Sequence, residues 1–223
     1  MTDSLSLAVS ALALGVSGTT AWLTLFRKGS VEMTLPTVIY FGPDVSTSSG
    51  RPAYPKVFLR ALLVATAKRG RVVESMHVSL TRNESHQTFS VWVHGDERLQ
   101  RGSGLFVGEA GVASNHHFLA PQDGRGFQFL AGRYRLQVHA KLLGNRKNIE
   151  LLSQEFEVPA DMATQLAAAP DAGLYFDWGP ESLRYHPHIE RKPPTMLSDG
   201  PLELGPPNLD ALMEAMGLRG NSK

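Results

Sequence analysis

The feature that most constrains this chain is a long apolar run close to its N-terminus. Residues Leu5–Phe26 read LSLAVSALALGVSGTTAWLTLF and contain no charged side chain. A helix rises about 1.5 Å per residue, so a run of this length matches the roughly 30 Å hydrocarbon thickness of a bilayer. Trp22 and Phe26 lie near one end of the run, where aromatic rings favour the membrane interface. We therefore expect residues 1–28 to form a transmembrane anchor that contacts the lipid bilayer through Leu5–Phe26.

The residues on either side of this run bear on its processing and its orientation. Residues Met1–Ser4 carry one acid and no Lys or Arg, whereas Arg27 and Lys28 follow the run. A cleaved signal peptide normally has basic residues before its apolar core, so this order favours an uncleaved anchor. Basic flanks tend to stay in the cytoplasm, which predicts a single-pass protein of a bacterial inner membrane with a cytoplasmic C-terminal domain. Ala11 and Gly15 share one helix face, and such a pair of small residues permits an oligomer.

Beyond the anchor, the sequence changes to short alternating segments separated by clusters of Gly, Pro, Asp and Ser. Alternation of apolar and polar residues with a period of two predicts β-strands. Gln87–His94, for example, is expected to be one strand with Phe89 on one face and Trp92 and His94 on the other. The helical crossovers of a parallel α/β fold are missing. The pattern therefore predicts an all-β domain over residues 29–158, built as an antiparallel sandwich.

One segment makes this prediction more specific. Gly132-Arg133-Tyr134 opens an alternating run in which Tyr134, Leu136 and Val138 share one face. It resembles the E–F corner of immunoglobulin-like domains, where a Tyr hydroxyl reaches back to the upstream backbone. The resemblance implies an immunoglobulin-like β-sandwich with Tyr134 in its core, and it implies no particular function. As a whole, the chain is similar to uncharacterised bacterial single-pass membrane proteins with a soluble β-domain.

The remaining residues, 159–223, are predicted to be a C-terminal extension rich in Pro and aromatic residues. Residues 161–169 favour a short helix. Residues 208–217 predict a second short helix, whose apolar stripe is formed by Leu209, Leu212, Met213 and Met216. This helix is expected to dock either on its own domain or in a groove of a partner. The same two alternatives apply to the aromatic residues of the extension, which are Tyr175, Phe176, Trp178 and Tyr185.

A second local resemblance concerns catalysis. Gly102-Ser103-Gly104 followed by Asn115-His116-His117 resembles the histidine loop of trypsin-like proteases, whose last His is the catalytic base. That family also needs a Ser in a Gly-x-Ser-Gly context and a second barrel. No serine after His117 has this context, and the remaining chain is too short for another barrel. We expect instead that His116 and His117 point to opposite faces of a strand, one inside the domain and one at its surface.

Metal and cofactor chemistry has only one candidate. The chain has no cysteine, which excludes disulfides, thiol catalysis and iron–sulfur clusters. His186, His188 and Glu190 are spaced two apart, so a strand would place them on one face as candidate metal ligands. The alternative is an ordinary surface or packing role. The sequence has no phosphate-binding loop and no dinucleotide fingerprint, and we expect no cofactor.

These observations together favour a non-enzymatic function. The formal net charge of +1 is unlike the basic bias of a dedicated nucleic-acid binder. The favoured hypothesis is a membrane-anchored interaction or scaffold module that recruits or regulates protein partners in a membrane-associated assembly. The main alternative is a domain on the envelope side that binds a glycan or a protein. A metal-dependent enzyme using His186 and His188 is the least favoured hypothesis.

Overall fold

A computed structural model describes residues 2–44, 54–96, 100–102, 104–121, 127–169 and 171–191. The chain divides into two compact units, Met1–Pro193 and Pro194–Lys223. The second unit lies outside the described residues. The predicted short helix over residues 208–217, with Leu209, Leu212, Met213 and Met216, therefore lies there as well.

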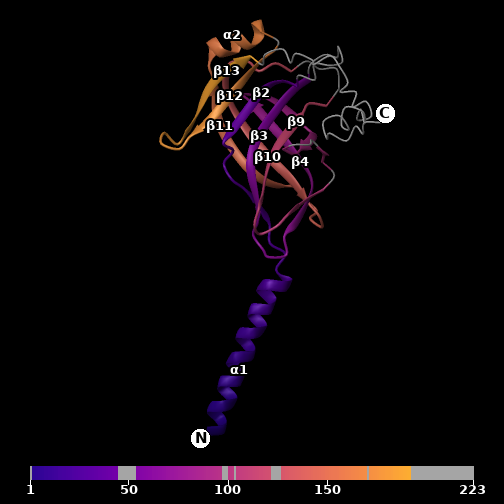
Figure 1. Ribbon diagram of the computed structural model, residues 1–223, viewed down its shortest axis with the longest axis vertical. Coiled ribbons are helices and arrows are strands. Elements are labelled where there is room, and N and C mark those ends of the chain that lie inside the picture. The colour runs from indigo at the N-terminus through magenta and orange to yellow at the C-terminus, as the bar shows by residue number, and fades with distance from the viewer. Residues whose placement is uncertain are drawn as a thin grey trace, which may run out of the picture. The chain divides into compact units, whose positions relative to one another are not determined.

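The N-terminal run is helical. Helix α1 spans Thr2–Ala21 and continues into a π-helical turn, η1, over Trp22–Phe26 (Figure 1). The segment Ser4–Thr24 is long and apolar enough to cross a membrane, although a signal sequence can have the same length and composition. Hydroxyl groups along the helix donate to carbonyls one turn earlier, as in Thr19 to Gly15 (2.8 Å) and Thr20 to Val16 (2.8 Å). These bonds satisfy the hydroxyls within the helix and lower the cost of placing them in an apolar surrounding.

The rest of the described chain is mostly strand, and the strands form two antiparallel sheets. The eight-stranded sheet has the order β13-β12-β2-β3-β9-β6-β7, with β1 also paired to β3. Its strands are β1 (Val31–Met33), β2 (Val38–Asp44), β3 (Tyr54–Ala65), β6 (Val91–His94), β7 (Gln100–Arg101), β9 (Val112–Leu119), β12 (Ala172–Gly179) and β13 (Arg184–Arg191).

The second sheet has five strands in the order β11-β10-β4-β5, with β8 also paired to β4. Its strands are β4 (Arg71–Arg82), β5 (Ser85–Phe89), β8 (Leu105–Val107), β10 (Gly132–Leu142) and β11 (Ile149–Val158). A short helix, α2 (Ala160–Ala168), joins β11 to β12 close to the expected position. The predicted antiparallel all-β class is thus confirmed, together with the apolar helix that precedes it.

One hydrophobic core is shared by the two sheets. Burial alternates along the longer strands β3, β9 and β10, as the period of two predicts, and residues from both sheets belong to a single cluster. Phe41 of β2 lies near its centre, with its ring centroid 4.9 Å from that of Phe129, 5.2 Å from Phe156 and 5.6 Å from Phe176. Such aromatic pairs add to the stabilisation that comes from apolar burial alone.

Strand β10 has the arrangement expected from its sequence. Tyr134, Leu136 and Val138 are buried, whereas Arg133 and Arg135 are exposed. The Tyr134 hydroxyl donates to the carbonyl oxygen of Leu130 at 2.8 Å. The prediction that this hydroxyl bonds to upstream backbone is therefore confirmed.

The segment 87–94 differs from its prediction as one strand. It breaks at Ser90 into β5, which pairs with β4, and β6, which pairs with β9 in the other sheet. Because the chain changes sheets, the alternation shifts by one residue, so that Phe89, Trp92 and His94 are all buried. If residues 87–94 are treated as one strand with a period of two, Phe89 and Trp92 fall on opposite faces. That treatment does not detect the change of sheet at Ser90.

The aromatic part of the expected extension belongs to the eight-stranded sheet. Strands β12 and β13 form a hairpin (Figure 1). Strand β12 pairs with β2, with Tyr175 opposite Tyr40. The β-domain thus continues past residue 158 to Arg191, whereas the sequence predicted that the extension begins at residue 159. The alternating pattern in residues 172–179 was obscured by the neighbouring Gly and Pro residues.

Candidate interaction surface

A row of ring-bearing side chains crosses the outer face of the eight-stranded sheet. Pairing is in register from His188 to Tyr175, from Tyr175 to Tyr40, from Tyr40 to Phe58 and from Phe58 to His117. These five residues come from the successive strands β13, β12, β2, β3 and β9. The residues beside Tyr175, Tyr40 and Phe58 along their strands belong to the core, so these three side chains point to the other face of the sheet. His188 and His117 share that face, because residues paired in register lie on the same side of a sheet. We call this set the aromatic row.

Members of the aromatic row contact one another. The ring centroids of His188 and Tyr175 are 5.4 Å apart and nearly parallel, and those of Tyr175 and Tyr40 are 4.8 Å apart. Phe58 and His117 are separated by 4.9 Å. Directly opposite residues of an antiparallel sheet have their Cβ atoms about 5 Å apart, which explains these spacings. These ring contacts form two groups, His188–Tyr175–Tyr40 and Phe58–His117, and strand register places Tyr40 opposite Phe58 between the groups.

Burial differs along the aromatic row. Tyr40 is only 4% exposed, because Tyr175 and the backbone near Gly42 and Gly173 cover its ring. Tyr175, Phe58, His117 and His188 are half-buried and present part of each ring to solvent. Burial raises the pKa of the Tyr40 hydroxyl, with smaller contributions from Tyr175 and Asp44, and burial also raises the pKa of Tyr175. Both phenols therefore stay neutral at physiological pH.

Charged side chains flank the row on both sides. At the hairpin, the His188 imidazole lies between two carboxylates, with Nδ1 3.2 Å from Asp177 Oδ2 and Nε2 3.6 Å from Glu190 Oε1. Lys56 Nζ lies 2.8 Å from Asp44 Oδ1, close to the Tyr40 ring. Lys56 and Asp44 pair with each other, so Asp177 and Glu190 are the groups that make the hairpin end of the row locally acidic.

Beyond Phe58, the outer face carries a polar network on β3 and β9. Arg60 donates to Asp96 Oδ1 at 3.1 Å and to Asn115 Oδ1 at 2.9 Å. The backbone N–H of Asn115 also donates to Asp96 at 3.2 Å. This network bonds β3 and β9 to the end of β6, and it holds the strands on which Phe58 and His117 are placed.

The candidate metal ligands lie on one strand face, as their spacing predicted, but they do not converge. His186 Nε2 is 2.7 Å from Ser182 Oγ, in the turn before β13. His188 instead contacts Asp177 and Glu190. Within the described part of the chain, no group of three His, Asp or Glu side chains is arranged to hold a metal ion.

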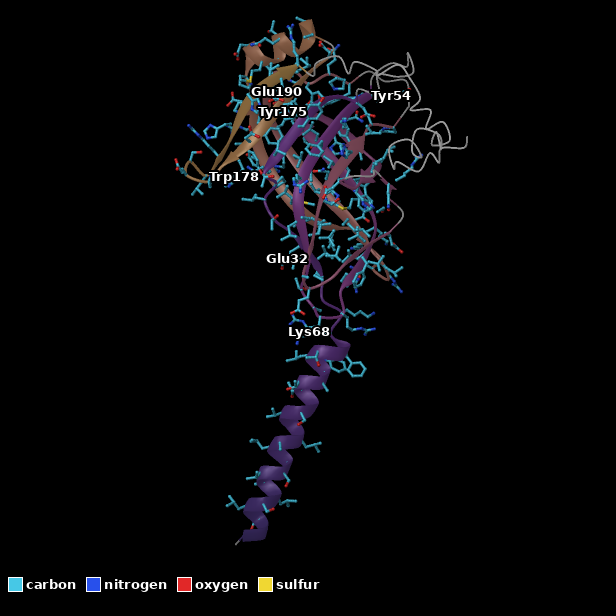
Figure 2. All side chains as sticks on the ribbon, in the orientation of Figure 1. Glu32, Tyr54, Lys68, Tyr175, Trp178 and Glu190 are labelled. Carbon is cyan, nitrogen blue, oxygen red and sulfur yellow. The ribbon has the colours of Figure 1, made fainter. Side chains whose placement is uncertain are left out.

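The aromatic candidates of the hairpin divide between surface and core. Tyr175 belongs to the aromatic row, and Trp178 is partly buried with its ring 5.1 Å from that of Tyr185 (Figure 2). Phe176 is 1% exposed and packs on Phe41 and Phe156. Tyr185 is buried, and its hydroxyl donates to the Pro36 carbonyl at 2.8 Å. Phe176 and Tyr185 therefore fix the hairpin to the core, and the outward surface comes from Tyr175.

His116 and His117 point to opposite faces of β9, as expected. His117 lies in the aromatic row, and His116 is fully buried. The indole N–H of Trp92 donates to His116 Nδ1 at 3.2 Å, which assigns the proton of the neutral ring to Nε2. Nε2 is buried and has no hydrogen-bond partner among the described residues. Burial, together with nearby His94 and His117, lowers the pKa of His116 to about 4.

An apolar hollow lies at the end of the domain that carries α2. It has a volume of about 380 Å³, and its walls include Phe127, Phe129, Ala163 and Leu166. None of the described residues that line it has an ionisable side chain. This lining offers apolar contact but no acid, base or nucleophile.

No protein-family model matches this chain, and no curated protein matches it. The geometry of the described residues is therefore what supports a function. Neutral phenols, partly exposed rings and paired charges are groups that bind by contact, stacking and hydrogen bonding.

Sequence reasoning identified Tyr175 and His188 but missed Tyr40, Phe58 and His117 as their neighbours. Successive residues of a strand point to opposite faces, so Tyr40 and Phe58 lie opposite to their core neighbours Phe41 and Leu59. What the sequence did not contain was the register that aligns five strands. That register depends on loops and on long-range packing.

Proposed function

We propose that this chain is a non-enzymatic, single-pass membrane protein whose β-domain binds a protein partner through the aromatic row. The observation that carries the proposal is the in-register alignment of His188, Tyr175, Tyr40, Phe58 and His117 across five strands. Aromatic side chains provide large contact areas at a low cost in conformational entropy, and they are enriched at protein interfaces. The module would recruit or regulate its partner in a membrane-associated assembly.

The chemistry around the row indicates what kind of partner surface fits. Asp177 and Glu190 flank His188, and the face of an aromatic ring carries negative potential. Cationic side chains, Arg above all, bind well to rings and carboxylates placed together. We therefore propose a partner segment that presents Arg or Lys beside apolar residues.

Site-specific photo-crosslinking in cells tests this proposal. The photoreactive amino acid benzoyl-phenylalanine replaces Tyr175 or Phe58 in the row. In a control, it replaces Gln137, which lies on the outer face of the five-stranded sheet. The proposal predicts the same crosslinked partner from positions 175 and 58 and none from position 137. Equal crosslinking from all three positions, or none from the row, would contradict it.

The charge on the partner can be tested with the same crosslink. We expect Asp177→Asn together with Glu190→Gln to reduce the yield at position 175, because these changes remove the carboxylates that attract a cationic segment. The control is Arg133→Gln together with Arg184→Gln, which also replaces two exposed charged side chains by uncharged ones but lies outside the row. If both pairs reduce the yield equally, the proposed partner chemistry is wrong.

The location of the module is part of the proposal. An uncharged run of this length followed by Arg27 and Lys28 supports a bacterial inner-membrane anchor with the β-domain in the cytoplasm. The tail segment 208–217 would provide a second contact to the partner through its apolar stripe. Deleting residues 208–223 should then lower the crosslinking yield at position 175 without changing the melting temperature of the β-domain.

We also propose that the two sheets form an immunoglobulin-like sandwich. The hydrogen bond from the Tyr134 hydroxyl to Leu130 supports this class, because the same corner recurs in such domains. The two antiparallel sheets around one core are consistent with it. The class itself implies no function, which is why the proposal rests on the aromatic row.

A second candidate function is supported by the same row. Flat, partly exposed rings also suit the apolar face of a sugar, and that reading requires the β-domain to lie on the envelope side. The side of the membrane on which the domain lies therefore separates a glycan-binding role from the favoured one.

A further inference from the structure

The end of the β-domain that follows the anchor is bonded directly to the chain leaving η1. The backbone N–H of Ser30 donates to Thr66 Oγ1 at 2.7 Å, and the N–H of Thr66 donates to the Ser30 carbonyl at 3.0 Å. Only three residues lie between Phe26 and Ser30, so their Cα atoms can be at most roughly 14 Å apart. The β3–β4 turn, residues 66–70, is therefore held close to the last residue of the apolar helix, whatever the angle between helix and domain.

A second turn is bonded to the same end. The N–H of Leu143, at the β10–β11 turn, donates to the Val72 carbonyl at 2.9 Å. The Arg71 guanidinium donates to the Leu143 carbonyl at 3.2 Å and to Asn145 Oδ1 at 2.9 Å. We call the two turns, residues 66–70 and 143–148, together with Lys28 and Phe106 of β8, the anchor-side end.

Two large apolar side chains are exposed at the anchor-side end. Phe106 is 61% exposed and Leu143 is 56% exposed. Gly70 lies against the Phe106 ring in a left-handed conformation (φ +65°), and a Cβ there would come within 2.5 Å of Phe106 Cζ. The turn is thus shaped around an aromatic ring that faces solvent.

Basic residues surround these apolar side chains. Lys28, Arg69 and Arg71 line a hollow of about 260 Å³ together with Phe106 and Leu143. Lys68 in the first turn (Figure 2) and Arg146 and Lys147 in the second add to the positive charge. The acid in the neighbouring β8–β9 turn is Glu109. The anchor-side end is therefore basic with an apolar tip.

We propose that the anchor-side end binds the anionic phospholipid headgroups of the bilayer that α1 spans, with Phe106 and Leu143 entering the interfacial region. Exposed apolar residues ringed by Lys and Arg are the arrangement by which surfaces bind to anionic membranes. The short connection to the helix keeps this end within reach of the headgroups, which favours lipid over a soluble protein as the occupant. The inference rests on the proposed anchoring by Leu5–Phe26.

Fluorescence of the full chain in lipid nanodiscs tests this proposal. Because the chain has no cysteine, Leu143→Cys gives a single site for an environment-sensitive fluorophore. Gln165→Cys, on the exposed side of α2, is the matched control site. The discs contain phosphatidylcholine alone or mixed with phosphatidylglycerol. Co-purification of the chain with the discs is checked first, since failure to incorporate would contradict the anchoring and this inference with it.

The expected result is a blue shift at position 143, and quenching by spin-labelled lipids, in the discs that contain phosphatidylglycerol. Both effects should weaken in high salt and be lost in the Lys68→Gln, Arg69→Gln variant, while Arg133→Gln, Arg184→Gln leaves them unchanged. Phe106→Ser should reduce the quenching. The proposal is overturned if incorporated protein gives the same emission at position 143 in both disc types, or if positions 143 and 165 respond alike.

Discussion

At the scale of single residues, His116 shows how the fold changes a side chain's chemistry. It is fully buried, accepts a hydrogen bond from Trp92, and leaves its own Nε2 without a partner among the described residues. A proton on this ring would place a charge in the core with no acid bonded to it. Because burial disfavours the charged form, the folded state keeps His116 neutral well below its usual pKa of 6.5.

The stability of the domain should consequently fall in mild acid. The unfolded chain binds a proton at this imidazole near pH 6.5, whereas the folded chain binds it only near pH 4. Between these values the unfolded state holds more protons, so the free energy of unfolding decreases as the pH falls, by about 3 kcal/mol in total for this group. Denaturant unfolding of the wild type from pH 7 to pH 4 measures this loss.

His116→Gln is the matched variant for that experiment, because it removes the titration but keeps a hydrogen-bond acceptor near Trp92. Its stability should depend less steeply on pH, and the slope that remains is assigned partly to His94 and His77, whose pKa values burial also lowers. An unchanged slope in the variant would show that His116 does not titrate in this range.

Tyr134 gives a second prediction at the residue scale. Tyr134→Phe removes the hydroxyl that donates to Leu130 and keeps the buried ring. The loss of one such bond should lower the free energy of unfolding by about 1 kcal/mol, as measured by chemical denaturation. Tyr175→Phe is the control, because no hydrogen bond of its hydroxyl is found among the described residues. If the two substitutions lower the free energy of unfolding equally, the hydrogen bond from Tyr134 to Leu130 does not contribute specifically to stability.

At the scale of elements, local patterns predicted some features well and others poorly. The alternation in β10 assigned its inward residues Tyr134, Leu136 and Val138 correctly. The break at Ser90 was not predicted, because a strand that changes sheets keeps its local β character. The hairpin β12–β13 was also missed, since Pro187 and nearby glycines resemble a linker.

The hairpin should therefore be required for folding, unlike the residues after it. Removing β12 and β13 deletes the buried side chains of Leu174, Phe176 and Tyr185. At about 1.5–3 kcal/mol each, their loss would cost about 5 kcal/mol or more, comparable to the whole stability of a typical domain. We expect a chain ending at Val158 to lose cooperative thermal unfolding and one ending at Pro193 to retain it. A cooperative transition in the shorter chain would contradict this assignment.

The candidate surface was predictable only in part, and the reason is physical. The sequence places Tyr175 and His188 among aromatic and ionisable residues, and it places Tyr40 opposite Phe41 along the chain. The alignment of five strands arises from long-range pairing, which a single sequence does not encode in a readable local pattern. A row formed by register is therefore recognised in the structure first.

At the scale of the whole molecule, three parts bear on function: an apolar N-terminal helix, a β-domain with an aromatic row, and a basic end of that domain close to the helix. The roles proposed for these parts require that the helix remains in the membrane and that the domain lies beside it. The anchoring and the side of the membrane are thus the claims on which the proposed function depends most.

One measurement tests these claims together. The Gln165→Cys variant has one cysteine, because the chain has no other. Spheroplasts that contain this variant are treated with a membrane-impermeant maleimide before and after lysis. The membranes are then washed with alkaline carbonate. A cytoplasmic, membrane-anchored domain predicts no labelling in intact spheroplasts, full labelling after lysis, and labelled protein retained in the washed membrane pellet. Labelling of intact spheroplasts, or release of the protein into the carbonate supernatant, would contradict it.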